Sequence, residues 1–367
     1  MKPVKTAVIG CGAISDIYLQ NMINKYATLD VVACCASHRE NAEKKAAQYG
    51  IRAASTDEIL ADGEVELIVV LTPAPTHYEL VKKALLAGKH VYTEKPLATE
   101  LWQARELLAL AEEKGLRLGA APETFLGSAL QTGRKALDDG LLGQISSFHV
   151  VANRDLTVLA SLFKFLRMPG GGIGYDYGVY YLTALVSLLG PMAKVYAQVD
   201  NLKPVRHNVV PFSPEFRQDY AYNEEAQINA VLTTKSGVVG TFSLNGDSAM
   251  QDQAYFTIHG TGGILQLTDA NQFGGEVRFL PNDPREAKWR VLEPVSALSD
   301  NCRGLGPANL AACIREGGAH LASGEMAAHV LEIIEQMMKS SEAGAPMELS
   351  TECARPEPFA AWEELLK

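Results

Sequence analysis

Short apolar runs alternate with segments of helical periodicity through the first 120 residues of the chain. The apolar runs predict strands at 6–9, 31–35, 67–71, 90–93 and 116–120, and the segments between them predict helices. Strands that are almost wholly apolar are typical of a sheet covered on both faces. Repeated strand–helix units therefore predict an α/β domain with a parallel sheet and right-handed crossovers.

The second half of the chain alternates apolar and polar residues one by one. This alternation predicts strands with one buried face at 144–152, 226–234, 238–244, 255–259 and 264–267, with glycine turns between successive pairs. The result is a large, mainly antiparallel open sheet, and a predicted helix at 175–189 would cover it. Further helices are predicted at 309–316, 325–340 and after Pro358. We expect two domains, 1–122 and 123–367, with the C-terminal helix packing back on the first domain.

The first predicted strand leads directly into the run Gly-Cys-Gly-Ala-Ile-Ser at 10–15, and a helix follows. Strand, glycine turn and helix in this order are typical of a dinucleotide-binding turn. Gly10 permits the tight turn, and Gly12 lets the backbone approach a pyrophosphate at the helix N-terminus. Ala13 and Ile14 would line the same site. A serine replaces the third glycine of the motif, and a glycine turn that binds nothing is the alternative.

The second predicted strand ends at Ser37, His38 and Arg39, without the acidic residue that binds the ribose 2′-hydroxyl of NAD. A hydroxyl, an imidazole and a guanidinium favour the 2′-phosphate of NADP. The alternative is that Arg39 is a solvated residue at the start of a helix. NAD and NADP both stay open as cofactors, and the residues favour NADP.

The third predicted strand ends at Thr72 and Pro73, at the same sheet edge as the glycine turn. Thr76 is expected to cap the following helix, and Thr99 is expected to cap the long helix that ends at Lys114. His77 would lie either on the nicotinamide side of a cofactor or in solvent.

The fourth predicted strand stops at Glu94-Lys95-Pro96. Pro96 cannot donate a hydrogen bond, and it disfavours helical backbone at Lys95. Ligands of open α/β sheets bind beyond the carboxyl ends of the strands. Lys95 is therefore expected to be a cation at a ligand site, with Glu94 and Pro96 beside it. A surface turn with a solvated lysine is the alternative.

A glycine-rich segment at 170–178 leads into the helix predicted at 175–189. Asp176 and Tyr180 are four residues apart, so they would share a helix face. A carboxylate and a phenol presented together could hold and deprotonate a hydroxyl group. The alternative is an aspartate stabilised by the helix dipole and a tyrosine of the core.

Composition limits the partners of this 367-residue chain. Hydrophobic residues make up 47% and charged residues 21%, as in an ordinary globular protein. The net charge of −10 argues against a nucleic-acid partner. The six cysteines show neither CxxC nor disulfide spacing, which is expected of reduced thiols in the cytoplasm. We expect no metal site, no signal peptide and no membrane span.

Two motifs together resemble the glucose–fructose oxidoreductase/inositol dehydrogenase (Gfo/Idh/MocA) family. They are Glu94-Lys95-Pro96 after Ala-Gly-Lys-His, and Gly-Gly-Gly-x-x-x-Asp176-x-Gly178-x-Tyr180. The resemblance covers nearly the whole chain, from the glycine turn to the helix at 325–340. It implies an N-terminal Rossmann domain, a C-terminal α/β domain with a large open sheet, and packing into homodimers or homotetramers. Members mostly oxidise or reduce a carbinol of a sugar or cyclitol with NAD(H) or NADP(H).

The resemblance also implies catalytic roles for Lys95, Asp176 and Tyr180. The inositol dehydrogenase pattern has a histidine where Tyr180 stands and an aspartate where Thr183 stands. Tyr180 resembles instead the branch with a catalytic tyrosine, and the loss of the second aspartate puts an inositol substrate in doubt. Tyr180 would exchange a proton with the substrate, Lys95 would hydrogen-bond the reacting oxygen and lower the phenol pKa, and Asp176 would orient the sugar or Lys95.

Residues at the substrate side are less defined. Glu123, His149, Asn153 and Arg154 lie where strands should open toward a substrate, and each has a structural alternative. The proline-containing stretch 201–222 is expected to be a substrate lid or an interface loop. Two other functions stay open: a regulator that binds NAD(P) and senses sugars without catalysis, and an enzyme that retains its cofactor and passes a hydride between two sugars.

Overall fold

The computed structural model describes residues 2–250 and 253–367. The chain forms two compact units. Unit 1 contains the residues up to Leu126 together with Asn301–Ala328 and Phe359–Lys367, and unit 2 contains Gly127–Asp300 and His329–Pro358. The division at residue 122 stays a prediction, and residues 301–328 belong to unit 1 although they follow the second sheet in the chain.

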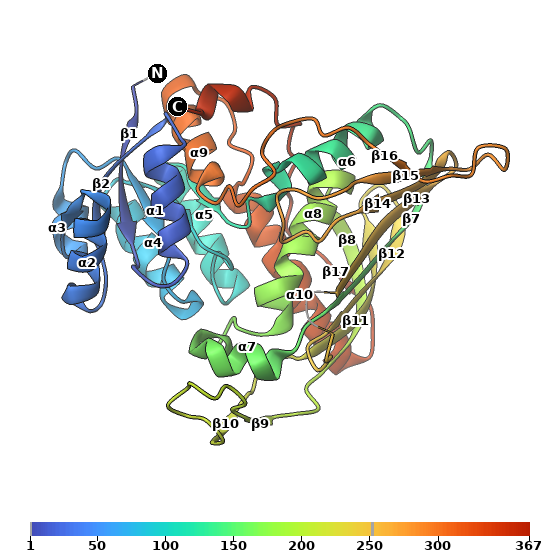
Figure 1. The fold of residues 1–367 in the computed structure, drawn as a ribbon, viewed down its shortest axis with the longest axis horizontal. Coiled ribbons are helices and arrows are strands. Elements are labelled where there is room, and N and C mark those ends of the chain that lie inside the picture. The colour runs from blue at the N-terminus through green and yellow to red at the C-terminus, as the bar shows by residue number, and fades with distance from the viewer. Residues whose placement is uncertain (1, 251–252) are drawn as a thin grey trace. The chain divides into compact units, whose positions relative to one another are not determined.

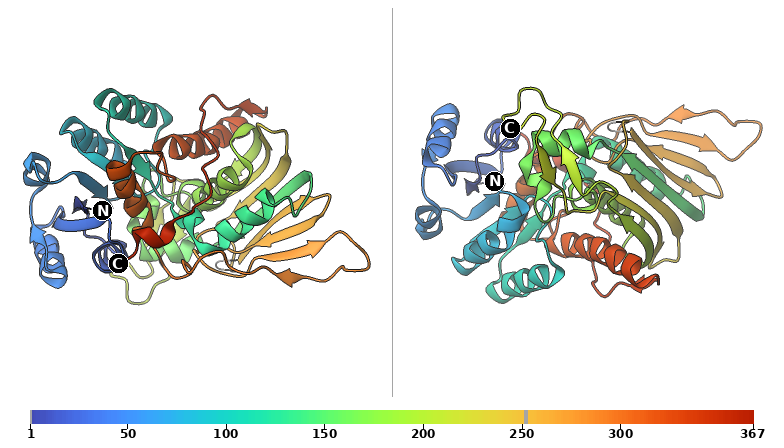
Figure 2. Two further views of the ribbon diagram at one scale, coloured as in Figure 1. Left: turned by 90° about the horizontal axis from the view of Figure 1, so that it is seen from above. Right: turned by 90° about the horizontal axis from the view of Figure 1, so that it is seen from below.

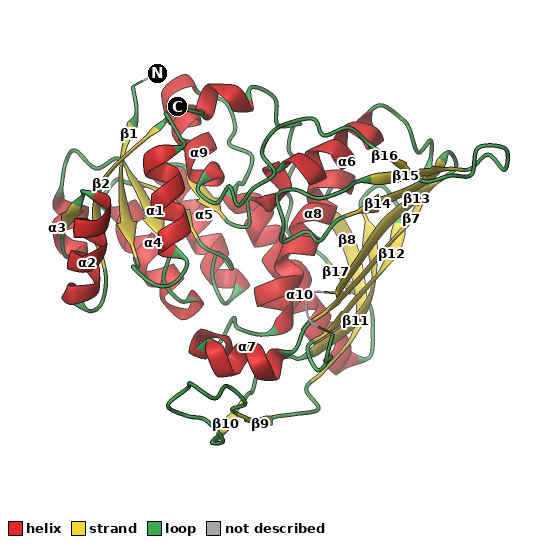
Figure 3. Ribbon diagram, viewed as in Figure 1, coloured by secondary structure: helices red, strands yellow, loops and turns green. Residues whose placement is uncertain are grey.

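Unit 1 is built on a parallel sheet whose described strands run in the order β3-β2-β1-β4-β5-β6 (Figures 1 and 3). Every residue of β4 is buried, as expected for a parallel sheet covered on both faces. The strand order reverses between β1 and β4, which is where ligands of this sheet type bind. The strands are β1 (Val4–Ile9), β2 (Leu29–Cys35), β3 (Arg52–Ala53), β4 (Leu67–Val70), β5 (His90–Thr93) and β6 (Leu118–Ala120).

Helices of unit 1 connect these strands, and two of the capping predictions are wrong. Thr99 does not cap a helix, because α5 begins at Leu101 and the Thr99 hydroxyl donates to Gln103. The Thr76 hydroxyl donates to Thr72 Oγ1 and the Pro73 carbonyl instead of accepting from the first turn of α4. The helices are α1 (Ser15–Asn24), α2 (Arg39–Tyr49), α3 (Thr56–Ala61), η1 (Ala74–Thr76), α4 (His77–Leu86), α5 (Leu101–Lys114) and η2 (Thr124–Leu126).

Later parts of the chain complete unit 1. The segment that carries α9 (Leu305–Glu316) bonds to the first residues of the chain: Tyr26 Oη donates to the Cys302 carbonyl at 2.6 Å, and Thr28 Oγ1 to the Ala308 carbonyl at 3.0 Å. The C-terminal residues include the 3₁₀ turn η5 (Trp362–Leu365). The amide of Ala27 donates to the carbonyl of Leu365.

Unit 2 contains a sheet whose described strands run in the order β16-β15-β14-β13-β7-β12-β11-β8-β17 (Figure 2). Only the β7–β12 pair is parallel among these described neighbours. The predicted fold class is therefore confirmed. The strands are β7 (Ile145–Asn153), β8 (Met192–Asp200), β11 (Gln227–Thr234), β12 (Val239–Asn245), β13 (Gln253–Gly260), β14 (Gly263–Leu267), β15 (Arg278–Pro281), β16 (Arg290–Val291) and β17 (Met347–Glu348).

Helices cover one face of this sheet. Gly178 packs so closely on the sheet that a Cβ there would lie 2.7 Å from Leu244, and a Cβ on Gly133 would lie 2.5 Å from Leu267. The opposite face carries half-exposed apolar side chains such as Val151, Tyr196 and Tyr255. The covering elements are α6 (Ser128–Asp138), the π-helical turn η4 (Gly174–Gly178), α8 (Val179–Leu189) and α10 (Gly324–Ala343), of which residues from 329 on belong to unit 2.

An arm formed by residues 201–222 extends from β8 and returns to β11. Within it β9 (Val205–His207) and β10 (Asp219–Ala221) form a short antiparallel hairpin that the sequence pattern did not predict. The helix α7 (Leu156–Leu162) and the 3₁₀ turn η3 (Lys164–Arg167) were also missed.

Candidate active site

The turn between β1 and α1 is shaped to receive a nucleotide phosphate. Gly10 has a φ of +114°, and a Cβ there would lie 2.7 Å from the backbone carbon and oxygen of Leu71. Gly12 and Ala13 are exposed, and the Cβ position of Gly12 has no described heavy atom within 4 Å. The residue before α1, Ile14, has an apolar side chain that cannot accept a hydrogen bond from the first-turn N–H groups. The Ser15 amide donates to the Gly12 carbonyl at 3.1 Å, and the first turn of α1 has no side-chain cap from Ile14.

The end of β2 presents Ser37 and His38 to solvent, and Arg39 begins α2. Arg39 Nε lies 2.8 Å from Glu43 Oε1, and both side chains are more than half exposed. The fork of a guanidinium has further N–H donors. The three residues thus form an exposed polar end to β2, where an adenosine ribose or its 2′-phosphate binds in sheets of this type.

His77 occupies a different place from either prediction. Its side chain is fully buried, with Nδ1 2.7 Å from the Pro96 carbonyl and Nε2 2.7 Å from the Thr72 carbonyl. Burial lowers the pKa of the His77 imidazole. The histidine therefore joins the end of β4 to the turn after β5: each ring nitrogen lies at hydrogen-bond distance from a backbone carbonyl, and the neutral ring donates to one of them.

Glu94 is linked to α1 through Tyr18. Tyr18 Oη donates to Glu94 Oε1 at 2.8 Å and lies 3.3 Å from Glu123 Oε2. Burial, Glu123 and Glu94 all raise the pKa of the Tyr18 phenol, which keeps its proton. The backbone N–H of Lys95 donates to Glu94 Oε2 at 3.1 Å. The position of Lys95 at the end of β5 is thus tied to α1.

Glu123 is a buried structural residue, and its predicted contact with substrate is not supported. Its side chain accepts hydrogen bonds from Tyr92 Oη at 2.8 Å and from the Gly304 amide at 2.9 Å, and the residue is 2% exposed. Burial and then Glu94 raise the pKa of its carboxyl group. Glu123 therefore fastens the segment before α9 to the sheet of unit 1.

In unit 2, Asp176 lies in the π-helical turn η4 and not in the α-helix that was predicted from residue 175. Its amide donates to the Gly172 carbonyl at 2.8 Å, and α8 begins only at Val179. A π-helical turn at the start of a helix is rare and is frequently found at functional sites. Both Asp176 and Tyr180 are 8% exposed.

Arg154 is the predicted substrate residue that the structure brings to Asp176. Arg154 Nη1 lies 3.4 Å from Asp176 Oδ2, and the guanidinium stacks 3.7 Å from the centre of the Tyr177 ring. Arg154 directly follows β7, and its amide donates to the Asn245 carbonyl at 2.8 Å. A cation and a carboxylate are therefore presented together beyond the ends of β7 and β12.

The neighbouring tyrosines have another role. Tyr181 Oη donates to Asp269 Oδ1 at 2.6 Å, and Tyr177 Oη lies 3.2 Å from Asp269 Oδ2. Burial and Asp269 raise the pKa of Tyr181, so this phenol stays protonated. Tyr177 and Tyr181 hold the helix through Asp269, and no local feature of the sequence separates them from Tyr180.

His149 and Asn153 lie on the other face of the sheet. Their neighbours Phe148, Val150 and Ala152 are fully buried beneath the helices, and side chains alternate between faces along a strand. His149 contacts Thr241 on the adjacent strand, and Asn153 donates to Gln253. Their predicted contact with substrate beside Asp176 is therefore wrong, because the prediction did not take account of strand alternation.

Among residues 2–250 and 253–367, no group of three His, Cys, Asp or Glu side chains is placed to hold a metal ion. Within the same residues, no helix has the length and apolar character needed to cross a membrane. The chemistry that the described side chains offer is the binding of a nucleotide, and the orientation and proton exchange of a hydroxylated substrate.

A parallel sheet with an open glycine turn at its switch point, and a lysine beyond a nearby strand, are typical of dinucleotide-binding domains. Residues 4–121 match the family model "Oxidoreductase family, NAD-binding Rossmann fold", and residues 130–266 match the "GFO/IDH/MocA C-terminal domain". The chain belongs to the GFO/IDH/MocA oxidoreductase family, and it is an enzyme of the NAD(P)-dependent dehydrogenase/reductase type.

Named relatives agree with this assignment. An uncharacterized oxidoreductase, C115.03 of Schizosaccharomyces pombe, is 27% identical over 95% of this chain and 100% of its own length. The dTDP-3,4-didehydro-2,6-dideoxy-alpha-D-glucose 3-reductase of Actinomadura kijaniata is 28% identical over 66% of this chain and 69% of its own. The structure of levoglucosan dehydrogenase in complex with NADH and L-sorbose has the same fold, with a TM-score of 0.82 at 18% identity over 95% of this chain and 99% of that one.

Proposed function

We propose that this enzyme transfers a hydride between a nicotinamide cofactor and a secondary alcohol or ketone of a sugar, glycoside or cyclitol. Membership of the family supports the class of reaction. The observation that carries the proposal is the turn at 10–14, where the space over Gly12 is open and the first-turn N–H groups of α1 have no side-chain acceptor from Ile14.

The residues at the sheet edge fit a dinucleotide. Gly10, Gly12, Ala13 and Ile14 would hold the pyrophosphate, and Thr72, Pro73 and the 94–96 turn would lie toward the nicotinamide. When bound, the cofactor donates or accepts the hydride. We propose NADP as the preferred form, because the end of β2 has a hydroxyl, an imidazole and a guanidinium and no carboxylate to bind the ribose 2′-hydroxyl.

We propose Lys95, Asp176 and Tyr180 as the catalytic residues. In this type of active site, a tyrosine exchanges the proton with the substrate. The Tyr180 phenol would give or take the hydroxyl proton, and the Lys95 ammonium would hydrogen-bond the reacting oxygen and favour the phenolate. Asp176 would accept a hydrogen bond from a substrate hydroxyl. Arg154, 3.4 Å from that carboxylate, orients it and supports this accepting role.

The test is a screen of sugars, glycosides and cyclitols with NAD and with NADP, followed by kinetics of Lys95→Ala, Tyr180→Phe and the double variant. General acid–base residues contribute about 10²–10⁴-fold, so each single variant should lower kcat by at least about a hundredfold. The double variant should lose little more than the worse single variant, because residues that act as a unit are not additive. The matched control is Lys114→Ala, whose side chain is 39% exposed at the end of α5.

Three results would contradict parts of the proposal. Normal turnover of Tyr180→Phe would remove the tyrosine from the reaction. Nucleotide binding without turnover of any substrate would favour the sugar-sensing regulator. A nucleotide that stays bound through purification, and is reduced by one sugar and reoxidised by another, would favour the sugar–sugar oxidoreductase.

We further propose that the chain forms homodimers or homotetramers in the cytoplasm. The sheet face opposite the helices has exposed apolar side chains on five neighbouring strands, at Val151, Tyr196, Val231, Val239 and Tyr255. Contiguous apolar surface of this kind is typical of protein interfaces. The described cysteines are all free, as expected in a reducing compartment. Light scattering of the wild type and of Tyr255→Lys would test the assembly, and a wild-type monomer would refute it.

A further inference from the structure

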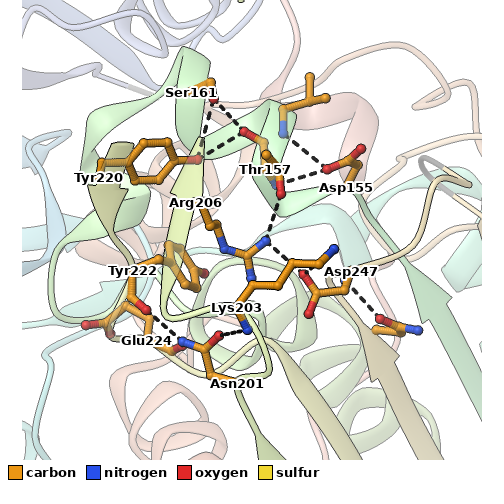
Figure 4. Close-up of polar contacts among 12 residues, drawn as sticks. Asp155, Thr157, Ser161, Asn201, Lys203, Arg206, Tyr220, Tyr222, Glu224 and Asp247 are labelled. Atoms are coloured by element: carbon orange, nitrogen blue, oxygen red, sulfur yellow. Dashed lines mark hydrogen bonds and ion pairs between the residues drawn. The ribbon is translucent and has the colours of Figure 1, made fainter. Parts of the chain in front are cut away.

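The arm, residues 201–222, is closed at its base by hydrogen bonds (Figure 4). Asn201 Nδ2 donates to the carbonyls of Tyr222 at 2.7 Å and Glu224 at 3.0 Å. The Tyr222 amide donates to the Pro204 carbonyl at 2.8 Å. These bonds bring the two ends of the arm together, and the orientation of the arm must then be decided by what its strands contact.

Arg206 on β9 is the buried contact of the arm. Its side chain is fully buried, and Nη1 donates to Asp247 Oδ1 at 2.8 Å and to Thr157 Oγ1 at 3.0 Å. The guanidinium lies 4.5 Å from the centre of the Tyr222 ring (Figure 4). A buried cation is costly unless a carboxylate and further contacts compensate it, and here Asp247, Thr157 and the Tyr222 ring surround the guanidinium.

The partners of Arg206 come from separate elements. Thr157 is in the first turn of α7, and Asp247 follows β12, so the guanidinium joins both to the arm. A second ion-pair cluster lies nearby, in which Glu215 of the arm pairs with Lys164 and, at 2.9 Å, with Arg167. The arm is thus fastened along α7 and η3.

The base of the arm also holds the glycine segment that carries Asp176. Tyr222 Oη donates to the Gly171 carbonyl at 3.4 Å, and Glu225 Oε1 accepts from the Gly174 amide at 2.8 Å. A Cβ on Gly172 would lie 1.9 Å from Glu225 Oε2, so a larger residue there would require the Glu225 carboxylate to move. The contacts run from Arg206 through Tyr222 to the residues directly before Asp176.

We propose that Arg206 is a positioning residue, which fixes the arm on unit 2 and, through Tyr222, holds the segment 171–176 so that Asp176 is oriented for substrate. The arm is therefore a fastened wall and not a freely opening lid. The kinetic consequence rests on the function proposed above, whereas the fastening itself does not.

The experiment compares Arg206→Met, Arg206→Lys and Tyr222→Phe in the full-length chain. The matched control is Arg285→Met, because Arg285 forms an ion pair of the same length, 2.8 Å with Asp283, but is 87% exposed. If Arg206→Met fails to fold, the double variant Arg206→Met/Asp247→Asn replaces it, since that variant leaves no buried unpaired carboxylate.

We expect faster hydrogen exchange of the amides at 171–176 and 203–222 in Arg206→Met, and of those at 171–176 alone in Tyr222→Phe. With a substrate from the screen, KM for the substrate should rise by roughly ten- to a hundredfold in Arg206→Met. The affinity for the nucleotide should stay within about twofold, since every contact of Arg206 given above lies in unit 2. Arg206→Lys should recover part of the loss, because it keeps the charge without the planar fork.

Unchanged exchange at 171–176 in both Arg206→Met and Tyr222→Phe would overturn the proposal. So would an Arg206→Met variant with altered exchange but wild-type KM and kcat. If the wild type turned over no sugar while exchange changed as expected, the proposed function would fail and the fastening of the arm would stand.

Discussion

Gly10 and Gly12 lie two residues apart in the turn between β1 and α1, and opposite outcomes are expected when each is replaced by alanine. Gly10 has a φ of +114°, and its Cβ would lie 2.7 Å from the Leu71 backbone. Gly12 has an ordinary φ, and its Cβ would have no described heavy atom within 4 Å. Gly10→Ala should therefore lower the stability of unit 1, whereas Gly12→Ala should alter the surface proposed to bind the nucleotide.

The magnitude for Gly10 follows from two costs. A side chain in this part of backbone space costs about 1–3 kcal/mol, and a methyl group forced against backbone adds about 1–3 kcal/mol. The free energy of unfolding of unit 1 should fall by the sum of the two, and each kcal/mol lowers the midpoint by roughly 2–4 °C for a domain of this size. Gly12→Ala should keep the wild-type midpoint but weaken nucleotide binding by roughly tenfold, or about 1.4 kcal/mol.

Calorimetry measures the unfolding midpoint, and titration of NADH and NADPH fluorescence measures the nucleotide affinity, on the same samples. Gly63→Ala is the control, because Gly63 is exposed in unit 1 and its Cβ position is also open. The reasoning fails if Gly10→Ala melts with the wild type, or if Gly12→Ala binds nucleotide with wild-type affinity.

Three further outcomes are expected. Arg315→Met should lower the free energy of unfolding by about 1–3 kcal/mol in urea titrations, because Arg315 forms a two-pronged pair with Glu66 at 2.6 and 2.7 Å; no change would mean that the pair contributes nothing. Hydrogen bonds from residues 350–351 lower the pKa of buried Glu332 to about 2, so its contribution is present above about pH 4.5 and lost as the pH falls toward 2. Glu332→Gln should show less of this acid dependence in thermal melts. Burial raises the pKa of Glu225 to about 7, so the wild type should lose stability as the pH rises from about 4.5 through 7. Glu225→Gln should flatten that part of the melting profile, and an identical profile would show that Glu225 does not titrate there.

Local patterns were enough to predict much of the fold. The apolar runs that end at Ile9, Cys35 and Thr93 are strands β1, β2 and β5, because a fully buried strand has few other ways to satisfy both its apolar side chains and its backbone. The glycine turn after β1 was also recognisable, since only glycine accommodates the backbone of Gly10. Cap positions such as Thr99 could not be predicted correctly, because a side-chain hydroxyl has several possible hydrogen-bond partners nearby and the sequence does not show which one it contacts.

The candidate site was predicted only where chemistry and strand ends coincide. Arg154 was identified with Glu123, His149 and Asn153 by the same reasoning, yet only Arg154 contacts Asp176. Glu123 is enclosed by Tyr92 and the Gly304 amide, which lies 181 residues away in the chain.

Residue types and their periodicity thus determine the strands and the glycine turn after β1, because these depend on short-range backbone geometry and on burial. Contacts between distant segments decide the remaining features. They enclose the Glu123 carboxylate, place the His77 ring between two backbone carbonyls, and bring Arg206 to Asp247. Such contacts are decided by the packing of the whole unit, where a buried charge is stable only beside its partner.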